Sequence, residues 1–415
     1  MLTAVLLFLC LFVGCPEIVA DAASVRTKKI VSVVYDDSGS MSGAKVYYTS
    51  YAMQCFAGML NKEDILEVTY MNGGQKTFDT SARQKTVDFI RQNASCKGGT
   101  PLSSIDTAFR ALKSHSNTDK NTQYWLVIVT DGAFHNGTAD DEDPAKSLQN
   151  TKKKVSECAS QTMPNGTSPR IVFFSICDTS NMYTPSFSEP NIDVKTAETA
   201  DDIINQISSI ACEISGRFEV DKKDIDIVDG RTVKVTADVP LTNIGVLTQK
   251  SDAVVKRVNY EGSADKMVES NVSVYIDSNA PITDAASLSG NIAIINDGNN
   301  NLPAGEYTIE FSEDISADDM VIMFEPAFEL RIEVFSGGKP VTDTSLLSVG
   351  NEIDVTATLY ETGTDNKILS SMLPKGTTYK MSRYEDGNNA GEVDGFELND
   401  IMLKKAENKI VATVD

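Results

Sequence analysis

Three oxygen-bearing side chains stand at alternate positions just after an apolar run near the start of the chain. The run is Lys29–Tyr35, and the three residues are Asp36, Ser38 and Ser40. Such a run predicts a buried strand that ends at the mouth of a sheet. One carboxylate and two hydroxyls are hard donors, which suit a hard divalent cation such as Mg²⁺ or Mn²⁺. The segment therefore predicts part of a metal site.

Two further oxygen donors occur in similar contexts along the chain. Thr100 stands in Gly98-Gly99-Thr100-Pro101-Leu102, and Asp131 directly follows the predicted strand Tyr124–Thr130. In an open parallel sheet, ligands bind at the carboxyl ends of strands near a topological switch point. We therefore expect all five donors to meet on one rim of the sheet.

The elements that must position these donors alternate between strand and helix from Ile30 to Ser215. This alternation predicts an α/β fold with a doubly wound, mostly parallel sheet that is covered on both faces. The predicted strands are Ile30–Tyr35, Ile65–Met71, Tyr124–Thr130 and Arg170–Cys177.

Helical spacing of apolar residues predicts helices between these strands. One begins near Thr100, which we expect to be its N-cap, with Pro101 at the first helical position. The last helix reaches Ile214, with Thr199 and Asp202 as its capping pair and Gly216 at its end.

Together the five donors resemble the metal-ion-dependent adhesion site of the von Willebrand factor type A domain. The family pattern is Asp-x-Ser-x-Ser, then a distant Thr, then a distant Asp, and all five positions are filled here. The contexts Ser-Gly-Ser-Met, Gly-Gly-Thr-Pro-Leu and Thr-Asp-Gly also match the family. The resemblance covers about residues 28 to 215, roughly half the chain.

The resemblance implies a metal centre that binds a protein ligand. The ion would be Mg²⁺ or Mn²⁺, with Ca²⁺ as a further candidate, and an acidic side chain of the ligand would complete its coordination. The alternative is a site that keeps the turn but binds no metal. The residues implied as metal ligands are Asp36, Ser38, Ser40, Thr100 and Asp131.

Other polar residues near the motif receive ordinary roles. Asp37 fills a free position of the pattern, and we expect a solvated loop carboxylate. The run Asp140-Asp141-Glu142-Asp143 is expected to be a solvated acidic loop rather than a second cation site or a selector of basic partners. His135 is expected to be an exposed loop residue rather than a metal ligand or a base.

Composition and missing motifs argue against several classes of function. The 415 residues carry a net charge of −22, which disfavours nucleic acid and anionic membranes as partners. The sequence has no Gly-x-Ser-x-Gly elbow and no Gly-x-x-x-x-Gly-Lys phosphate loop, and no general base stands out beside Ser38 or Ser40. We therefore expect a protein that is not an enzyme.

The N-terminus is typical of an export signal of the bacterial type. The apolar run Leu2–Val13 is shorter than the ~20 residues of a membrane-spanning helix, and small residues precede a cleavage point after Ala22. The segment has no Lys or Arg ahead of that run, and Cys15 leaves a lipoprotein signal open as the alternative. We expect the mature protein to be secreted or held at the cell surface.

Cysteine spacing gives no sign of a zinc site, because no Cys-x-x-Cys pair exists. Cys55, Cys177 and Cys212 lie in apolar patterns and are expected to be small core residues. One disulfide among the cysteines outside the signal remains an alternative, and their spacing does not identify which two would form it. The cysteines outside the signal are Cys55, Cys96, Cys158, Cys177 and Cys212.

After Gly216 the helical pattern gives way to short alternating strands and turn dipeptides, which predict two all-β sandwich modules. Strand examples are Thr232–Val239, Val272–Ile276, Tyr307–Phe311, Met320–Phe324, Leu330–Val334 and Glu352–Tyr360. The expected divisions are a signal peptide at 1–22, a type A domain at 23–216, a β-sandwich at 217–327 and an immunoglobulin-like module at 328–415.

The chain ends inside the strand-like segment Lys409–Asp415, so we expect the last module to lack its final strand. A membrane anchor is expected, if at all, in a missing C-terminal segment.

Three hypotheses of function follow. The first is a secreted or cell-surface adhesion protein whose type A domain binds a protein ligand through a divalent cation, with the β modules as a stalk. The second is an assembly subunit of an envelope or pilus-like complex. The third is a metal-dependent accessory subunit of a chelatase-type enzyme, which the export signal disfavours.

Overall fold

The computed structural model describes most of the chain after the N-terminal segment. The predicted export signal, with Cys10, Cys15 and Ala22, lies outside the described residues. The described residues are 27–93, 95–119, 122–135, 143–176, 183–261, 267–268, 271–282, 288–297, 300–341, 347–369, 373, 379–385, 388–404 and 408–414.

A six-stranded sheet forms the centre of the first domain, in the order β3-β2-β1-β4-β5-β6. All neighbours pair in parallel except β2 and β3, which are antiparallel. The central strands are near-continuous apolar runs because both faces of the sheet are covered. The strands are β1 Lys29–Tyr35, β2 Ile65–Tyr70, β3 Gly74–Asp79, β4 Gln123–Thr130, β5 Arg170–Ile176 and β6 Ile192–Ala197.

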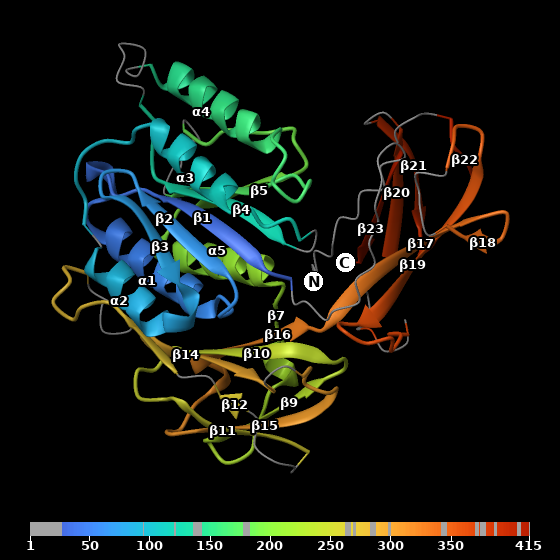
Figure 1. Ribbon diagram of the computed structural model, residues 1–415. Helices are drawn as coiled ribbons and strands as arrows, with labels where there is room; N and C mark the ends of the chain where they lie inside the picture. Colours follow the sequence, from blue (N-terminus) through green and yellow to red (C-terminus); the bar gives the residue numbers. More distant parts are fainter. Residues whose placement is uncertain are drawn as a thin grey trace.

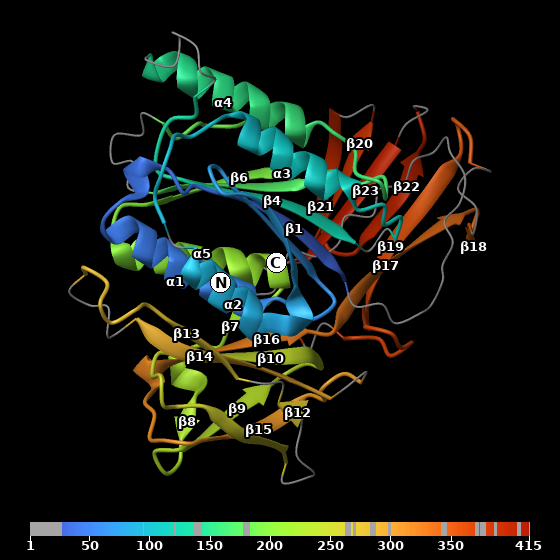
Figure 2. The same cartoon turned by 60° about the vertical axis from the view of Figure 1, so that its left-hand side comes forward.

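Helices cover this sheet on two sides, as Figures 1 and 2 show. Apolar residues of α3 and α4 pack with Ile30 and Val34 on one face, while those of α1, α2 and α5 pack with Val31 and Val33 on the other. The predicted doubly wound α/β fold is confirmed. The helices are α1 Ala44–Met59, α2 Arg83–Gln92, α3 Ser103–Ser114, α4 Pro144–Ala159 and α5 Ala200–Ser215, with short 3₁₀ turns η1 Gly39–Met41 and η2 Thr80–Ala82.

The two predicted helix starts have opposite outcomes. Thr199 and Asp202 form the predicted capping box of α5, and Gly216 ends that helix in the left-handed region with φ of 72°. The prediction that Thr100 caps α3 is wrong. Helix α3 begins only at Ser103, without a side-chain cap, because the segment before it pairs with His135 through backbone bonds at Thr100 and Leu102.

A first β module follows α5 and consists of two sheets. Their orders are β12-β14-β10-β16-β7, with β13 also paired to β14, and β11-β15-β9-β8. The elements are β7 Phe218–Glu219, η4 Lys222–Asp224, β8 Asp226–Ile227, β9 Thr232–Ala237, β10 Leu241–Thr248, β11 Val255–Tyr260, β12 Met267–Val268, β13 Val272–Tyr275, β14 Ser289–Asn296, β15 Gly305–Phe311, η5 Ala317–Asp319 and β16 Met320–Pro326.

The first β module packs against the helices of the α/β domain, so it does not form the projecting stalk that we expected. Its β10–β14–β16 sheet lies between α1 and α5 on one side and the second sheet on the other (Figure 1). A Cβ on Gly58 of α1 would lie 2.6 Å from Cδ1 of Ile292, so this glycine allows helix and sheet to approach closely.

Two glutamines extend this interface by hydrogen bonding to the backbone of β13. Gln84 accepts from the backbone N–H of Ser273 at 2.8 Å and donates to its carbonyl at 3.2 Å. Gln54 makes the same pair of bonds to Tyr275, each at 3.2 Å. One edge of β13 is therefore paired with β14 and the other is held by helix side chains.

A second β module begins directly after the first, with Ala327 as the single residue between β16 and β17. The backbone of Ala327 donates to Pro240 and accepts from Thr362, which fixes the junction. The two sheets have the orders β18-β17-β19-β22 and β21-β20-β23. The strands are β17 Phe328–Ser336, β18 Lys339–Pro340, β19 Glu352–Glu361, β20 Tyr379–Glu385, β21 Asn388–Asp394, β22 Glu397–Met402 and β23 Asn408–Val414. The predicted β modules after the α/β domain are confirmed as antiparallel sheets, while the domain limits stay predictions.

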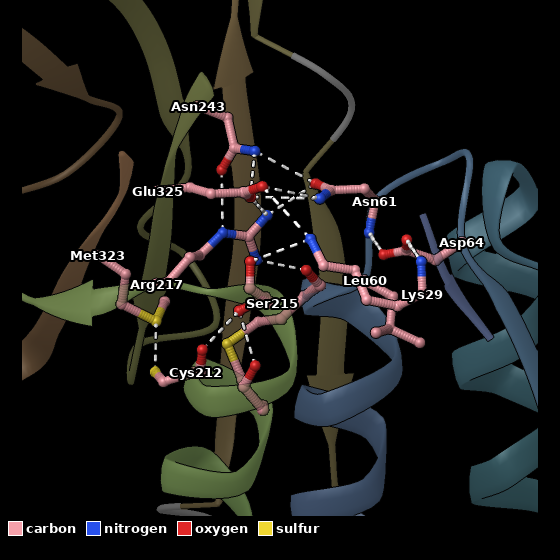
Figure 3. A network of polar contacts seen from close by, with 12 residues as sticks. Lys29, Leu60, Asn61, Asp64, Cys212, Ser215, Arg217, Asn243, Met323 and Glu325 are labelled. Atoms are coloured by element: carbon pink, nitrogen blue, oxygen red, sulfur yellow. Dashed lines mark hydrogen bonds and ion pairs between the residues drawn. The ribbon is translucent and has the colours of Figure 1, made fainter. Parts of the chain in front are cut away.

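A buried polar network joins the end of α5 to the first β module (Figure 3). Arg217 donates to the carbonyl of Met59 and to side-chain oxygens of Asn61 and Asn243, at 2.8 Å and 2.9 Å for the last two. Glu325 on β16 accepts from Asn243 at 2.6 Å and from Asn61 at 3.2 Å. The network thus connects α1, the segment after α5, β10 and β16.

Four cysteines lie among the described residues, and all four are free thiols. Cys55 is buried as predicted, and its burial raises the pKa of its thiol to about 12. Cys212 is only partly buried, and Cys177 lies outside the described residues. Among the residues that the structure describes, no helix is long and apolar enough to cross a membrane.

Candidate metal centre

Three loops meet at the carboxyl edge of the parallel sheet and carry the predicted donors. The backbone N–H of Asp36 donates to Val129, which extends the β1–β4 pairing by one residue. Gly39 donates to the carbonyl of Gly98 at 3.2 Å, which joins the first loop to the loop of Thr100. These contacts place the loops after β1 and β4 beside the loop before α3.

Asp36 is fully buried, and neutral groups orient its carboxylate. One oxygen accepts from the backbone N–H of Ser38 at 2.9 Å, and the other accepts from the Thr130 hydroxyl at 2.7 Å. Burial raises the pKa of this carboxyl, although the bonds from Ser38 and Thr130 oppose the shift. A buried carboxylate held by neutral donors would gain from a nearby cation.

Ser38, Ser40 and Asp131 form a chain of direct contacts. The Ser38 and Ser40 hydroxyl oxygens lie 2.9 Å apart, and Ser40 donates to one oxygen of Asp131 at 2.7 Å. The other Asp131 oxygen accepts from the ammonium group of Lys45. Two hydroxyls and a carboxylate are thus gathered beside the buried Asp36, whose Oδ2 also lies 3.4 Å from the backbone N of Asp131.

Thr100 lies on the same rim but has its own partner. Its side chain is buried, and its hydroxyl donates to the carbonyl of Ala133, two residues after Asp131. Because the hydroxyl proton points to Ala133, the oxygen lone pairs remain free to coordinate a cation. Direct contacts therefore join four of the five predicted residues. Thr100 lies near them because its hydroxyl contacts the loop that follows Asp131.

The expectation of a solvated Asp37 is wrong. The residue is buried, and one carboxylate oxygen accepts from the backbone N–H of Asn72 at 2.7 Å and from its side chain at 3.1 Å. The same Asn72 donates to the carbonyl of Gly99 at 2.8 Å. Asp37 therefore ties the loop after β1 to the end of β2 and to the loop of Thr100.

The remaining polar candidates contribute little to the rim. The side chain of His135 is exposed as predicted, and its backbone pairs with Thr100 and Leu102. Asp140, Asp141 and Glu142 lie outside the described residues, and Asp143 caps α4 by accepting from Ala145 at 2.9 Å. Within the described ranges, no group of three or more His, Cys, Asp or Glu is placed to hold a metal.

The donor set fits a hard divalent cation, because every available atom is oxygen and only two residues supply charge. When bound, such an ion would supply positive charge to the rim and an electrophilic position for a ligand oxygen. The chain's own contribution is to orient Asp36 through Ser38 and Thr130 and to hold the Ser40 hydroxyl against Asp131.

Sequence reasoning missed three residues that shape the rim: Lys45, Asn72 and Thr130. Lys45 did carry a local signal. A basic residue in the first turn of a helix is repelled by the helix dipole, so an acidic partner nearby is expected. Thr130 belongs to the Thr-Asp-Gly context that matched the family, but its bond to Asp36 was not predicted. Asn72 gave no signal, because it acts on a residue far away in the sequence.

The chain is similar in structure to several solved proteins. One is "von Willebrand factor type A from Catenulispora acidiphila", at 11% identity and a TM-score of 0.31, with 90% of this chain and 66% of that chain covered. A second is the pilus adhesin SpaC from Lactobacillus rhamnosus GG, at 11% identity and a TM-score of 0.33, with 94% and 53% covered.

A third similar structure is the manganese-loaded TRAP protein of Plasmodium vivax, at 12% identity and a TM-score of 0.29, with 46% of this chain and 74% of that chain covered. The chain thus spans 66% of the Catenulispora protein and 53% of SpaC. No family model matches the sequence, and no curated protein matches it.

Proposed function

We propose that this chain is an exported or cell-surface adhesion protein that binds a protein ligand through a divalent cation. The cation is Mg²⁺ or Mn²⁺, and its ligands are Asp36, Ser38, Ser40, Thr100 and Asp131. The observation that supports this most is the Ser38–Ser40–Asp131 chain of contacts beside the buried Asp36.

The donor set indicates what the ion would bind. The five donors include two carboxylates, Asp36 and Asp131, and the other three are neutral hydroxyls. Mg²⁺ prefers six oxygen ligands, some of them waters, so a position stays open for a further oxygen. An acidic side chain of the protein ligand can take that position, and its negative charge makes it a stronger ligand for the ion than water.

The test measures cation binding and ligand capture on the same protein. Isothermal titration with Mg²⁺ should show one site, which Asp131→Ala abolishes. Candidate surface proteins captured in Mg²⁺ should be released by chelator and recaptured after Mg²⁺ is restored. Equal capture in chelator, or by a Ser38→Ala/Thr100→Ala variant, would show that the metal rim is not the binding surface.

A separate measurement tests the assembly role raised from the sequence. Light scattering of the purified chain in Mg²⁺ should show no growth in size if the rim serves a separate ligand. Metal-dependent self-association without another protein would indicate instead that the domain assembles copies of this chain into an envelope or pilus-like array.

A further inference from the structure

Lys45 places a positive charge inside the candidate metal centre. It lies in the first turn of α1, the helix that follows the Asp36–Ser40 loop, and its ammonium group forms an ion pair with Asp131. The Asp131 side chain is 1% exposed and that of Lys45 is 31% exposed. The carboxylate is therefore almost out of water, while the lysine still reaches solvent.

Both oxygens of Asp131 are engaged by this arrangement. Ser40 donates to Oδ1 at 2.7 Å, and Lys45 donates to Oδ2. The serine is neutral, so among the described contacts Lys45 supplies the charge that balances this carboxylate. Asp36, in contrast, accepts from the neutral Ser38 and Thr130.

The position of Lys45 is unfavourable apart from this contact. The partial positive charge at a helix N-terminus repels a basic side chain in the first turn. The four-carbon stem of lysine is flexible, and a part-exposed ammonium can turn out into water at little cost. Among the described contacts, Lys45 therefore has Asp131 as its ion-pair partner on the rim, and its flexible stem lets it leave that partner.

We propose that Lys45 is a tethered counter-ion that sets how tightly the rim binds a divalent cation. This inference rests on the metal site of the proposed function. The ammonium and the cation compete for the charge of Asp131, because two positive centres close together repel strongly where water is largely excluded. Cation binding and release of Asp131 by Lys45 are then coupled, and the lysine lowers the affinity of the site.

The first arm of the test compares cation affinity by titration calorimetry with Mg²⁺. Lys45→Met keeps the stem but removes the charge, and we expect it to bind Mg²⁺ about tenfold more tightly than the natural chain. Lys45→Arg keeps the charge and should stay near the natural affinity. Lys113→Met, at an exposed lysine of α3 that donates to Gln161, controls for the loss of one surface charge.

The second arm measures thermal unfolding in chelator, so it does not depend on bound metal. Lys45→Met should lower the unfolding midpoint in the natural background, because Asp131 loses its charge partner. The same change in an Asp131→Asn background should have little effect. This double-mutant cycle tests the ion pair itself.

The outcomes separate this inference from the proposed function. If the natural chain binds Mg²⁺ and Lys45→Met binds it equally or less tightly, the counter-ion role is overturned and the metal site remains. If neither chain binds Mg²⁺, the metal site fails and the competition fails with it. Additive effects in the cycle would likewise overturn the inference, since they mean that Lys45 and Asp131 do not interact.

Discussion

Arg217 and Glu325 form an ion pair between two domains, with Nη2 of the arginine 3.4 Å from Oε2 of the glutamate. Arg217 is the first residue after the Gly216 cap of α5, and Glu325 lies on β16 of the first β module. Their side chains are 0% and 9% exposed. The pair therefore links the last helix of the α/β domain to the neighbouring sheet within a buried polar network (Figure 3).

The contacts around this pair satisfy both charges. Lys29 of β1 lies 3.5 Å from the other Glu325 oxygen and also donates to the carbonyl of Ser215 at 3.2 Å. Burial lowers the pKa of Arg217, while the charge of Glu325 opposes that shift. Because β1, α5 and β16 share these contacts, the α/β domain and the first β module are expected to unfold together.

The first prediction concerns loss of the buried arginine. Arg217→Met should lower the free energy of unfolding by about 3 kcal/mol. Glu325 then keeps only Lys29 as a charge partner, and the side-chain oxygens of Asn61 and Asn243 lose Arg217 as a hydrogen-bond donor. Urea denaturation at neutral pH measures the change. Arg231→Met, which removes an exposed arginine 2.8 Å from Asp314, is the matched control and should change stability little. Equal losses in the two variants would contradict a stabilising role for the network.

The second prediction concerns the acid dependence of stability. Burial raises the pKa of Glu325, but the charges of Lys29 and Arg217 outweigh it, so the pKa lies below its ordinary value of 4.5. A carboxyl whose pKa is depressed on folding contributes stability above its unfolded pKa, and that contribution is lost as the pH falls. The stability gap between the natural chain and Glu325→Gln should therefore be largest near neutral pH.

That gap should stay nearly constant from about pH 7 to about pH 5 and then shrink as the pH falls through 4.5 toward about 3. In this lower range Glu325 of the unfolded natural chain takes up a proton more readily than Glu325 of the folded chain, and the Gln variant has no such difference. Urea denaturation over both ranges measures the gap. Glu352→Gln, at an exposed position of β19, controls for the loss of one surface carboxylate. A gap that stays constant or widens below about pH 5 would contradict the depressed pKa.

The third prediction tests the contact between α2 and β13. Gln84→Leu should lower the free energy of unfolding by about 1–3 kcal/mol, because the backbone N–H and carbonyl of Ser273 lose their partner at a part-buried edge. Gln92→Leu, on an exposed position of the same helix, should be near neutral. Chemical denaturation of both variants makes the comparison, and equal effects would show that the edge contact is not stabilising.

The fourth prediction concerns salt and the acidic surface. A partner that offers a carboxylate is repelled at long range by a chain of net charge −22. Salt screens such repulsion over about 10 Å at 0.1 M, whereas contacts within the rim are screened less. Capture in saturating Mg²⁺ should therefore strengthen modestly as NaCl is raised. Binding that weakens steeply with salt would indicate a basic patch as the binding surface.

Local signals in the sequence predicted the elements that they directly control. The start and end of α5 depend on Thr199, Asp202 and Gly216, which are neighbours of the helix itself, and the structure confirms them. The buried strands β1, β4 and β5 were recognisable because each is a continuous apolar run. Strand β3 was missed because it is mostly exposed and only Phe78 is buried.

Contacts between distant residues could not be predicted in this way. Asp37 is buried because Asn72, from the end of β2, satisfies its carboxylate. Thr100 lies three residues before α3 because its backbone pairs with that of His135. The packing of the first β module on α1 depends on Gly58 meeting Ile292, which only the folded chain brings together. The motif thus predicted the residue types of the rim but not the contacts that hold them.

The last prediction concerns stabilisation by the cation. A ligand that binds only the folded chain stabilises it by RT ln(1 + [L]/Kd), about 2.7 kcal/mol when Mg²⁺ is present at 100 times its Kd. Saturating Mg²⁺ should therefore raise the thermal unfolding midpoint of the natural chain. Asp131→Ala should remove this rise, because the rim loses one of its two carboxylates and the anchor for the Ser40 hydroxyl.

Asp143→Ala is the control that separates the rim from nearby acidic residues. Asp143 follows the same loop but accepts from Ala145 at the start of α4, so its loss should lower the midpoint equally with and without Mg²⁺. The Mg²⁺-dependent rise should remain in this variant. A rise that survives in Asp131→Ala but disappears in Asp143→Ala would place the cation in the acidic loop and overturn the rim as the metal centre.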